Sequence, residues 1–180
     1  MKYPLPPKCH LLAMEYVTHS FDYTLNDFNE KNPDKRAYNI LTGQIAQFFF
    51  FEWYKLNSEY PIKMEPSSFD KTDKYDLKIS TEKREYILDV KATTRMEFAG
   101  QVNAIYKNKA IDYFIFSYID KDLQWIEPLG IVSKGLALKK DFFIPYNTII
   151  PGTNTKNRFP KGSYFVPRKD MTALPISLSP

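Results

Sequence analysis

The sequence has little cysteine and no long apolar run. Cys9 is the only cysteine among 180 residues, so a disulfide framework is excluded and a reducing compartment is expected. No apolar run approaches the roughly 20 residues that span a bilayer. The longest, IAQFFFF, is interrupted by Gln47 and followed by Glu52, and the N-terminal MKYPLPPKCH lacks the apolar core of a signal peptide. These absences predict a soluble cytoplasmic protein that does not enter a membrane.

Several catalytic signatures are also missing. The chain has no Gly-rich phosphate-binding loop and no Gly-x-Ser-x-Gly motif. His10 and His19, together with Cys9, do not have the spacing of a zinc site. The sequence therefore does not indicate a P-loop enzyme, a hydrolase with a nucleophile elbow or a zinc module.

The chain does contain enough apolar residues to form the core of one domain. Hydrophobic residues make up 43% of the sequence and charged residues 26%, which favours a folded core over disorder. Residues 131–180 carry eight Lys or Arg and two Asp, whereas the first 130 residues carry 17 basic and 19 acidic side chains. We therefore expect a single domain over 1–180 with a basic, loop-rich C-terminal extension at about 134–180, where a polyanion can bind.

The order of the predicted elements indicates an α/β fold. Thr42 is expected to cap a helix that ends near Asn57, after an irregular segment at 22–39. Strands are expected at roughly 61–65, 75–80, 85–92 and 112–119, with a helix at 99–110 before the last of them. The first 20 residues fit helix or strand, and another strand pair is expected at 123–133. The order helix, three strands, helix, strand predicts a mixed central sheet flanked by helices.

Two of these strands carry acids among apolar residues. Because strand side chains alternate between faces, Ile87, Asp89 and Lys91 share one face of the third strand. If residues 81–84 form the turn of a hairpin, positions whose numbers sum to 165 pair with one another. That register places Asp76 directly opposite Asp89, with Cβ atoms about 4.5–5.5 Å apart.

Two opposed carboxylates destabilise a sheet unless something lies between them. A divalent cation removes the conflict, and oxygen ligands of this kind suit Mg²⁺ or Mn²⁺. Lys91 lies two residues from Asp89, where it can orient or deprotonate a metal-bound water and offset charge on an attacked phosphate. The carbonyl of Val90 is a candidate third ligand.

Asp76, a hairpin and then Asp89-Val90-Lys91 resemble the PD-(D/E)XK nuclease superfamily, which has the restriction-endonuclease-like fold. The resemblance covers residues 42–119, and the family core has the element order predicted above. It implies Mg²⁺-dependent hydrolysis of nucleic-acid phosphodiesters, with Asp76 and Asp89 binding metal and Lys91 serving the attacking water. Double-stranded DNA is the expected substrate, and a homodimer would cut both strands most simply.

The sequence departs from this family at two places. Tyr75 stands before Asp76, where the family name has proline. Many members carry a glutamate in the first helix, but Gln44 and Gln47 occupy that region here, and Glu52, one to two turns later, is the candidate to replace it. The leading interpretation is a metal-dependent DNA endonuclease, for example of restriction type. The alternative is a catalytically weak or inactive nucleic-acid-binding module of the same fold, which the missing glutamate would support.

Overall fold

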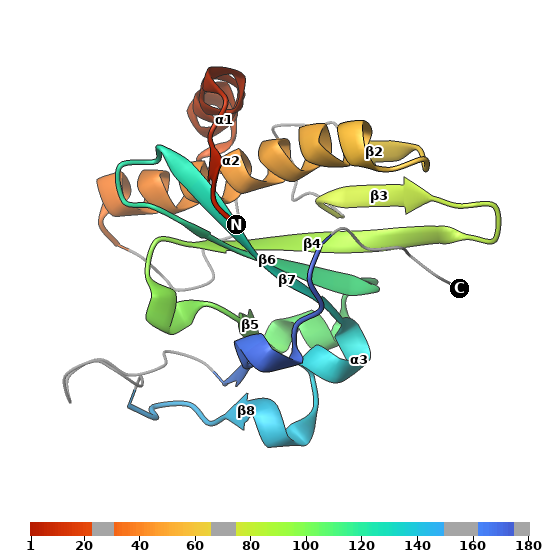
Figure 1. The fold of residues 1–180 in the computed structure, drawn as a ribbon. Helices are drawn as coiled ribbons and strands as arrows, with labels where there is room; N and C mark the ends of the chain where they lie inside the picture. The colour runs from red at the N-terminus through yellow and green to blue at the C-terminus, as the bar shows by residue number, and fades with distance from the viewer. Residues whose placement is uncertain (23–30, 66–74, 150–161, 175–180) are drawn as a thin grey trace.

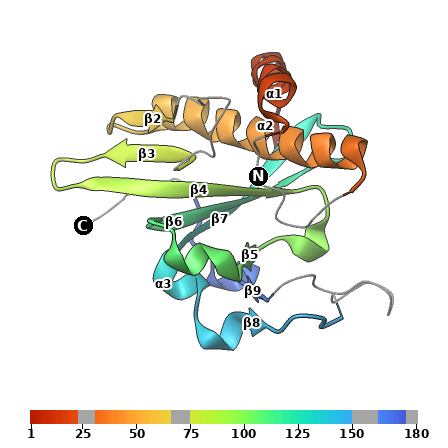
Figure 2. The same cartoon turned by 180° about the vertical axis from the view of Figure 1, so that it is seen from behind.

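The computed structural model describes residues 1–22, 31–65, 75–149 and 162–174, and it shows a mixed α/β fold. A six-stranded sheet has the order β1-β7-β6-β4-β3-β2, in which β4 and β6 are parallel and the other neighbouring strands are antiparallel. Figures 1 and 2 show two helices on one face of this sheet and a smaller sheet with short helical turns on the other. The strands of the large sheet are β1 (Tyr3–Pro4), β2 (Ile62–Met64), β3 (Leu77–Ser80), β4 (Glu85–Thr93), β6 (Tyr113–Ile119) and β7 (Trp125–Ser133).

The two helices are α1 (Pro7–Ser20) and α2 (Pro33–Asn57), and α2 begins earlier than predicted. Asn32 caps α2, because its side chain accepts a hydrogen bond from Lys35 N at 3.1 Å, and Pro33 occupies the first turn. Thr42 is not a cap, since its hydroxyl donates to Tyr38 O inside the helix. The prediction of an irregular segment was therefore wrong for residues 33–39, because Asn-Pro-Asp is a helix start as well as a turn signal; residues 23–30 of that segment lie outside the described residues.

The helices cover one face of the sheet with an apolar core. The buried positions of α2 recur at helical spacing, so one stripe of the helix faces the strands. Even-numbered residues of β4 and odd-numbered residues of β3 project into the same layer. The main members of this first core are Cys9, Ala13, Ile45, Ala46, Phe49, Phe50, Tyr54, Leu77, Ile79, Leu88, Val90, Ile115, Ile119 and Ile126.

The predicted helix at 99–110 does not form. The chain instead makes η1 (Met96–Phe98), strand β5 (Gln101–Asn103) and a 3-10 helix, η2 (Ala104–Asn108). Gly100 explains the difference, because its φ of +95° is left-handed and a Cβ there would lie 2.2 Å from the Val166 carbonyl oxygen. The segment is pulled into strand pairing with the C-terminal region, which a local pattern could not show.

The C-terminal extension packs against the second face of the sheet. It contains α3 (Lys134–Ala137), η3 (Lys140–Phe142), β8 (Phe143–Ile144), β9 (Ser163–Phe165) and η4 (Arg168–Asp170). A small sheet of order β5-β9-β8 results, to which the described part of the extension contributes the two short strands β8 and β9. The strand pair predicted at 123–133 is a single strand, β7, paired with β6. The second core consists mainly of Val102, Tyr106, Ile111, Phe114, Phe116, Leu129, Val132, Ala137, Tyr164 and Val166.

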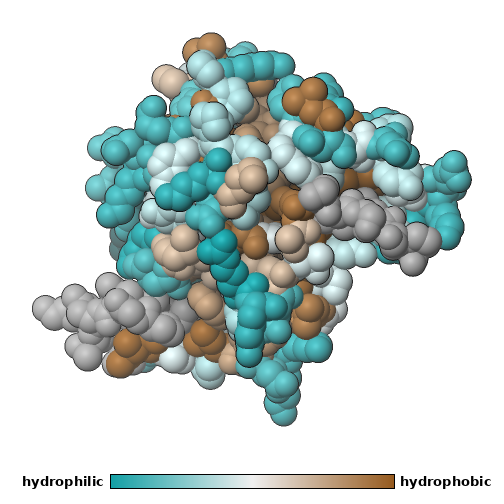
Figure 3. All heavy atoms as spheres, viewed as in Figure 1, coloured by the Kyte–Doolittle hydropathy of each residue, from teal (hydrophilic) through white to brown (hydrophobic). Residues whose placement is uncertain are grey.

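The surface is mixed in polarity. On the face drawn in Figure 3, small hydrophobic groups occur at the top, in the middle and along the lower edge, interspersed with hydrophilic side chains. Leu11 and Met14 of α1 are exposed, as is Phe143 of β8. Within the described parts of the chain, no helix combines the length and apolar character needed to cross a bilayer.

Candidate active site at the β3–β4 hairpin

The hairpin register that the sequence predicts is confirmed. Leu77 pairs with Leu88 and Ser80 with Glu85, so the partner numbers sum to 165 throughout the ladder. The connection is closed by a hydrogen bond from Thr81 N to the carbonyl oxygen of Arg84, 3.0 Å long. The four-residue turn TEKR therefore sets which residues of the two strands oppose one another.

Asp89 and Lys91 lie on the face of the sheet away from the helices. Their neighbours Leu88 and Val90 belong to the core under α2, so alternation directs the two charged side chains to the opposite face. Asp89 is 7% exposed, which is unusual for a carboxylate and requires a compensating charge or hydrogen bond.

Lys91 supplies that charge. Its Nζ forms an ion pair with Asp89 Oδ1 at 2.5 Å and lies 3.8 Å from the centroid of the Tyr106 ring. Burial opposes the charge on Lys91, but the attraction of Asp89, with further contributions from Tyr106 and Asp76, prevails and raises the pKa of Lys91. The side chain is an ammonium at neutral pH in this arrangement, which suits orienting a water and offsetting negative charge rather than removing a proton.

Asp76 reaches the same site from a position just before β3. Its Oδ2 accepts a hydrogen bond of 2.7 Å from Val90 N, between Asp89 and Lys91. The predicted pairing of Asp76 with Asp89 is thus modified, because the ladder stops at Leu77 and the Asp76 carboxylate caps the next free N–H of β4. The three predicted residues are brought together, with Asp76 anchored on the backbone of the Asp-x-Lys segment.

Gln47 of α2 forms a hydrogen bond with this segment. Its side chain is buried, and Nε2 donates to the backbone carbonyl of Asp76 at 3.2 Å. Glu52 lies five residues later, about 140° around the helix, and its Oε1 instead pairs with Lys8 Nζ of α1 at 2.9 Å. The prediction that Glu52 completes the site is therefore not supported, and the residue beside Asp76 is an amide.

The oxygen atoms at this site are of the type that hard divalent cations prefer as ligands. Asp76 and Asp89 offer carboxylate oxygens. The Val90 carbonyl points toward β3 beyond the last β3–β4 pair, because the N–H and C=O of one strand residue face the same neighbour. Within the described residues no group of three or more His, Cys, Asp and Glu side chains is arranged to hold a metal. Two carboxylates with one carbonyl match Mg²⁺, which commonly keeps several waters and takes one or two carboxylates from the protein.

Two residues near the site were not assigned a role from the sequence. Tyr106, in η2, places its ring against Lys91. Glu65 follows β2, and the β2–β3 register carries it to the position opposite Asp76, where its Oε2 accepts a hydrogen bond from Tyr75 N at 3.2 Å. The register of β2 could have indicated Glu65, whereas no sequence signal pairs Tyr106 with Lys91.

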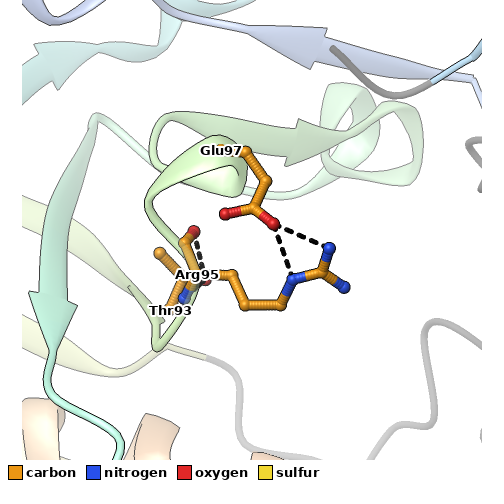
Figure 4. Close-up of polar contacts among 3 residues, drawn as sticks. All are labelled: Thr93, Arg95 and Glu97. Carbon is orange, nitrogen blue, oxygen red and sulfur yellow. Dashed lines mark hydrogen bonds and ion pairs between the residues drawn. The ribbon is translucent and has the colours of Figure 1, made fainter. Parts of the chain in front are cut away.

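The chain leaves the site through a polar turn after β4. Figure 4 shows Arg95 directed at Glu97, with Nε and Nη2 donating to the same carboxylate oxygen at 2.9 and 2.7 Å. Thr93 Oγ1 bonds with the backbone of Arg95 on the inner side of the turn. A hydrogen bond from its own backbone and the contact with Arg95 lower the pKa of the Glu97 carboxyl. The turn therefore fixes the direction in which the chain leaves the Asp-x-Lys segment.

Comparison with known proteins identifies no family: no family model, curated protein or solved structure matches the chain. The site has to be interpreted from its own chemistry.

Proposed function

We propose that the protein is a metal-dependent nuclease that hydrolyses phosphodiester bonds in DNA. The observation that supports this most is the placement of Asp76, Asp89 and Lys91 around one short stretch of β4, with Asp76 bound to Val90 N and Lys91 bound to Asp89. A buried carboxylate, a second carboxylate beside it and an ammonium can hold a divalent cation and stabilise the charge that develops on a phosphate during hydrolysis.

Each residue has a separate task in the proposed reaction. Asp76 and Asp89, with the Val90 carbonyl, would hold Mg²⁺ or Mn²⁺, which supplies Lewis acidity and an acidified water when bound. Lys91 orients the attacking water and offsets the negative charge that develops on the phosphate. Gln47 holds the backbone of Asp76, so that the Asp76 carboxylate stays beside Val90 N of β4. Water adds across one P–O bond, leaving a phosphate on one fragment and a hydroxyl on the other.

The test is divalent-dependent cleavage of supercoiled plasmid by purified protein and its variants. We expect wild type to cut with Mg²⁺ or Mn²⁺ and not with EDTA, and Asp89→Asn and Lys91→Ala to lose at least about 100-fold, as removing an electrostatic catalytic group commonly does. Lys78→Ala is the matched control, because Lys78 follows Asp76 by two residues, as Lys91 follows Asp89, but pairs with Glu85 at 3.1 Å. Equal cutting by all variants would mean that a contaminating nuclease is responsible.

Glu52→Gln sharpens the assignment. Because Glu52 pairs with Lys8 on the α1–α2 surface, this variant should cleave as wild type does. A loss of activity equal to that of Asp89→Asn would instead place Glu52 in the site. A parallel reaction on RNA of matched length distinguishes the two nucleic acids.

One observation favours a second candidate function. The helix residue next to Asp76 is Gln47, so the described site has two carboxylates and weaker metal binding is expected. The protein would then be a nucleic-acid-binding module with weak or absent cleavage. Salt-sensitive DNA binding without any cutting in Mg²⁺ or Mn²⁺ would favour this function over the nuclease.

A further inference from the structure

The 3-10 helix η2 connects the candidate site with the protein surface. Tyr106 is 6% exposed and packs edge-on against Phe114, with ring centroids 5.9 Å apart. Lys91 Nζ lies 3.8 Å from the centroid of the Tyr106 ring, and Lys109 Nζ lies 4.7 Å from the same centroid. The ammonium of Lys91 and that of Lys109 therefore both rest against the ring of Tyr106, which links the site to Lys109. Figure 2 shows η2 as the green helical turn beside β5.

Two more lysines extend this positive charge. Lys107 is exposed on η2, with its Nζ 5.5 Å from the centroid of the Tyr164 ring. Lys134 of α3 donates from Nζ to the Lys109 carbonyl at 2.5 Å, which adds a third charge to the same surface.

Lys107, Lys109 and Lys134 have no carboxylate partner within the described part of the chain, whereas Lys91 is paired with Asp89. The ion pairs there include Lys8, Lys78 and Lys91, but neither Lys107 nor Lys109. The nearby carboxylate of Asp112 is already engaged, since Oδ2 accepts a hydrogen bond from Ile87 N and Oδ1 pairs with Arg84. A surface of unneutralised ammonium groups next to a phosphate-processing site fits a polyanion.

The structure holds η2 in a defined position relative to the site. Asn103 caps it, accepting a hydrogen bond from Ile105 N at 3.1 Å, and Ala104 N donates to the Gly162 carbonyl at 3.1 Å. The strand β5 before it pairs with β9 of the C-terminal extension. The lysines are therefore presented from an anchored turn.

From these observations we propose that Lys107 of η2 and Lys109, which directly follows η2, bind the nucleic-acid phosphates next to the bond that is cut, with Lys134 adding to the positive field. This inference rests on the proposed function and names the surface over which its substrate lies. An ammonium over an aromatic face still has N–H donors that can point away from the ring, so these lysines can bind a phosphate while they rest on Tyr164 and Tyr106.

The test measures DNA binding separately from cleavage. Binding of a short fluorescein-labelled duplex in EDTA is followed by anisotropy over a series of KCl concentrations. The double variant Lys107→Ala/Lys109→Ala should lower the slope of log Kobs against log salt by about 2, because each phosphate contact contributes about 1. Wild type should consequently lose roughly tenfold more affinity than this variant between about 50 and 200 mM salt.

Two further double variants separate position from net charge. Lys55→Ala/Lys63→Ala removes the same charge from α2 and β2, and it should keep the wild-type slope. Lys107→Arg/Lys109→Arg keeps the charge on η2, and it should also keep the slope. In Mg²⁺, the η2 alanine variant should raise KM and leave kcat within about twofold, since it changes a phosphate contact and not the reacting groups.

The outcomes distinguish this inference from the nuclease proposal. Equal salt slopes for the η2 alanine variant and wild type would overturn the assignment of phosphate binding to η2. The same holds if the Lys55/Lys63 variant lowers the slope as much as the η2 variant does. Neither result would contradict the nuclease proposal. If the salt slope of wild type exceeds that of the η2 alanine variant as expected but wild type never cuts DNA, phosphate binding by the η2 lysines is supported and the nuclease proposal is rejected. Wild type that binds no DNA at low salt would reject both.

Discussion

The two faces of the large sheet are packed in different ways. Under α1 and α2 the core is almost entirely apolar, and the side chains of Phe50, Ile45 and Leu88 are fully buried there. On the opposite face Asp89 and Lys91 stand among the aromatic residues of the second core, beneath short helical turns and the small sheet. The comparison indicates that the helix face is stabilised by apolar burial, whereas the other face combines a second apolar core with charged groups whose burial costs free energy.

The largest effect is expected from a cavity on the helix face. Phe50→Ala should lower the free energy of unfolding by about 3–5 kcal/mol, because Phe50 is fully buried against Phe49 with ring centroids 5.4 Å apart. Urea unfolding followed by tryptophan fluorescence measures this. Leu56→Ala on the same helix is the control, since Leu56 is 84% exposed and should change stability by less than about 0.5 kcal/mol. Similar losses for the two variants would contradict the assignment of this core.

The next effect concerns the tight approach of the C-terminal extension to the other face. Gly100→Ala should cost about 1–3 kcal/mol, because the new Cβ would meet the Val166 carbonyl at a left-handed φ. Gly43→Ala is the matched substitution within α2, where no atom lies within 4 Å of the added Cβ. It should stabilise the protein by roughly 0.5–1 kcal/mol, which gives the two glycine variants opposite signs in thermal unfolding.

A smaller effect tests the aromatic support of Lys91. Tyr106→Leu should be less stable than Tyr106→Phe by about 0.5–2 kcal/mol, because phenylalanine keeps a ring face beneath the ammonium. The same two substitutions in a Lys91→Met background isolate the interaction as a double-mutant cycle. If the difference between Leu and Phe is as large without the ammonium as with it, Tyr106 contributes through packing alone.

The smallest effect is expected at the exposed turn after β4. Glu97→Gln should cost about 0.2–1 kcal/mol at pH 7, as surface ion pairs do. Because the folded pKa of Glu97 lies below its ordinary value, its contribution is present above that ordinary value and is lost as the pH falls through the lower folded value. Thermal unfolding of wild type and variant should therefore converge on acidification. A gap that stays constant down to strongly acidic pH would show that the charge of Glu97 is not involved.

The sequence predicted the hairpin well and the segment after it badly. The register of β3 and β4 follows from a four-residue turn and a two-residue alternation, both of which are local properties. The helix expected at 99–110 failed because Gly100 sits against Val166 and β5 pairs with β9, contacts that depend on residues far along the chain. The early start of α2 was readable from Asn32 and Pro33, but the same residues also mark turns.

Some features of the candidate site could likewise be predicted from the sequence, and others could not. The presence of Asp89 and Lys91 on one face of β4 could be predicted, because side chains alternate along any strand. The choice of Gln47 over Glu52, the ring of Tyr106 under Lys91 and the capping of Val90 N by Asp76 could not, because each joins separate elements. Local order along the chain therefore specified the strands and their register. The packing of distant segments settled which groups surround the acids, since that depends on how whole elements dock and not on their spacing.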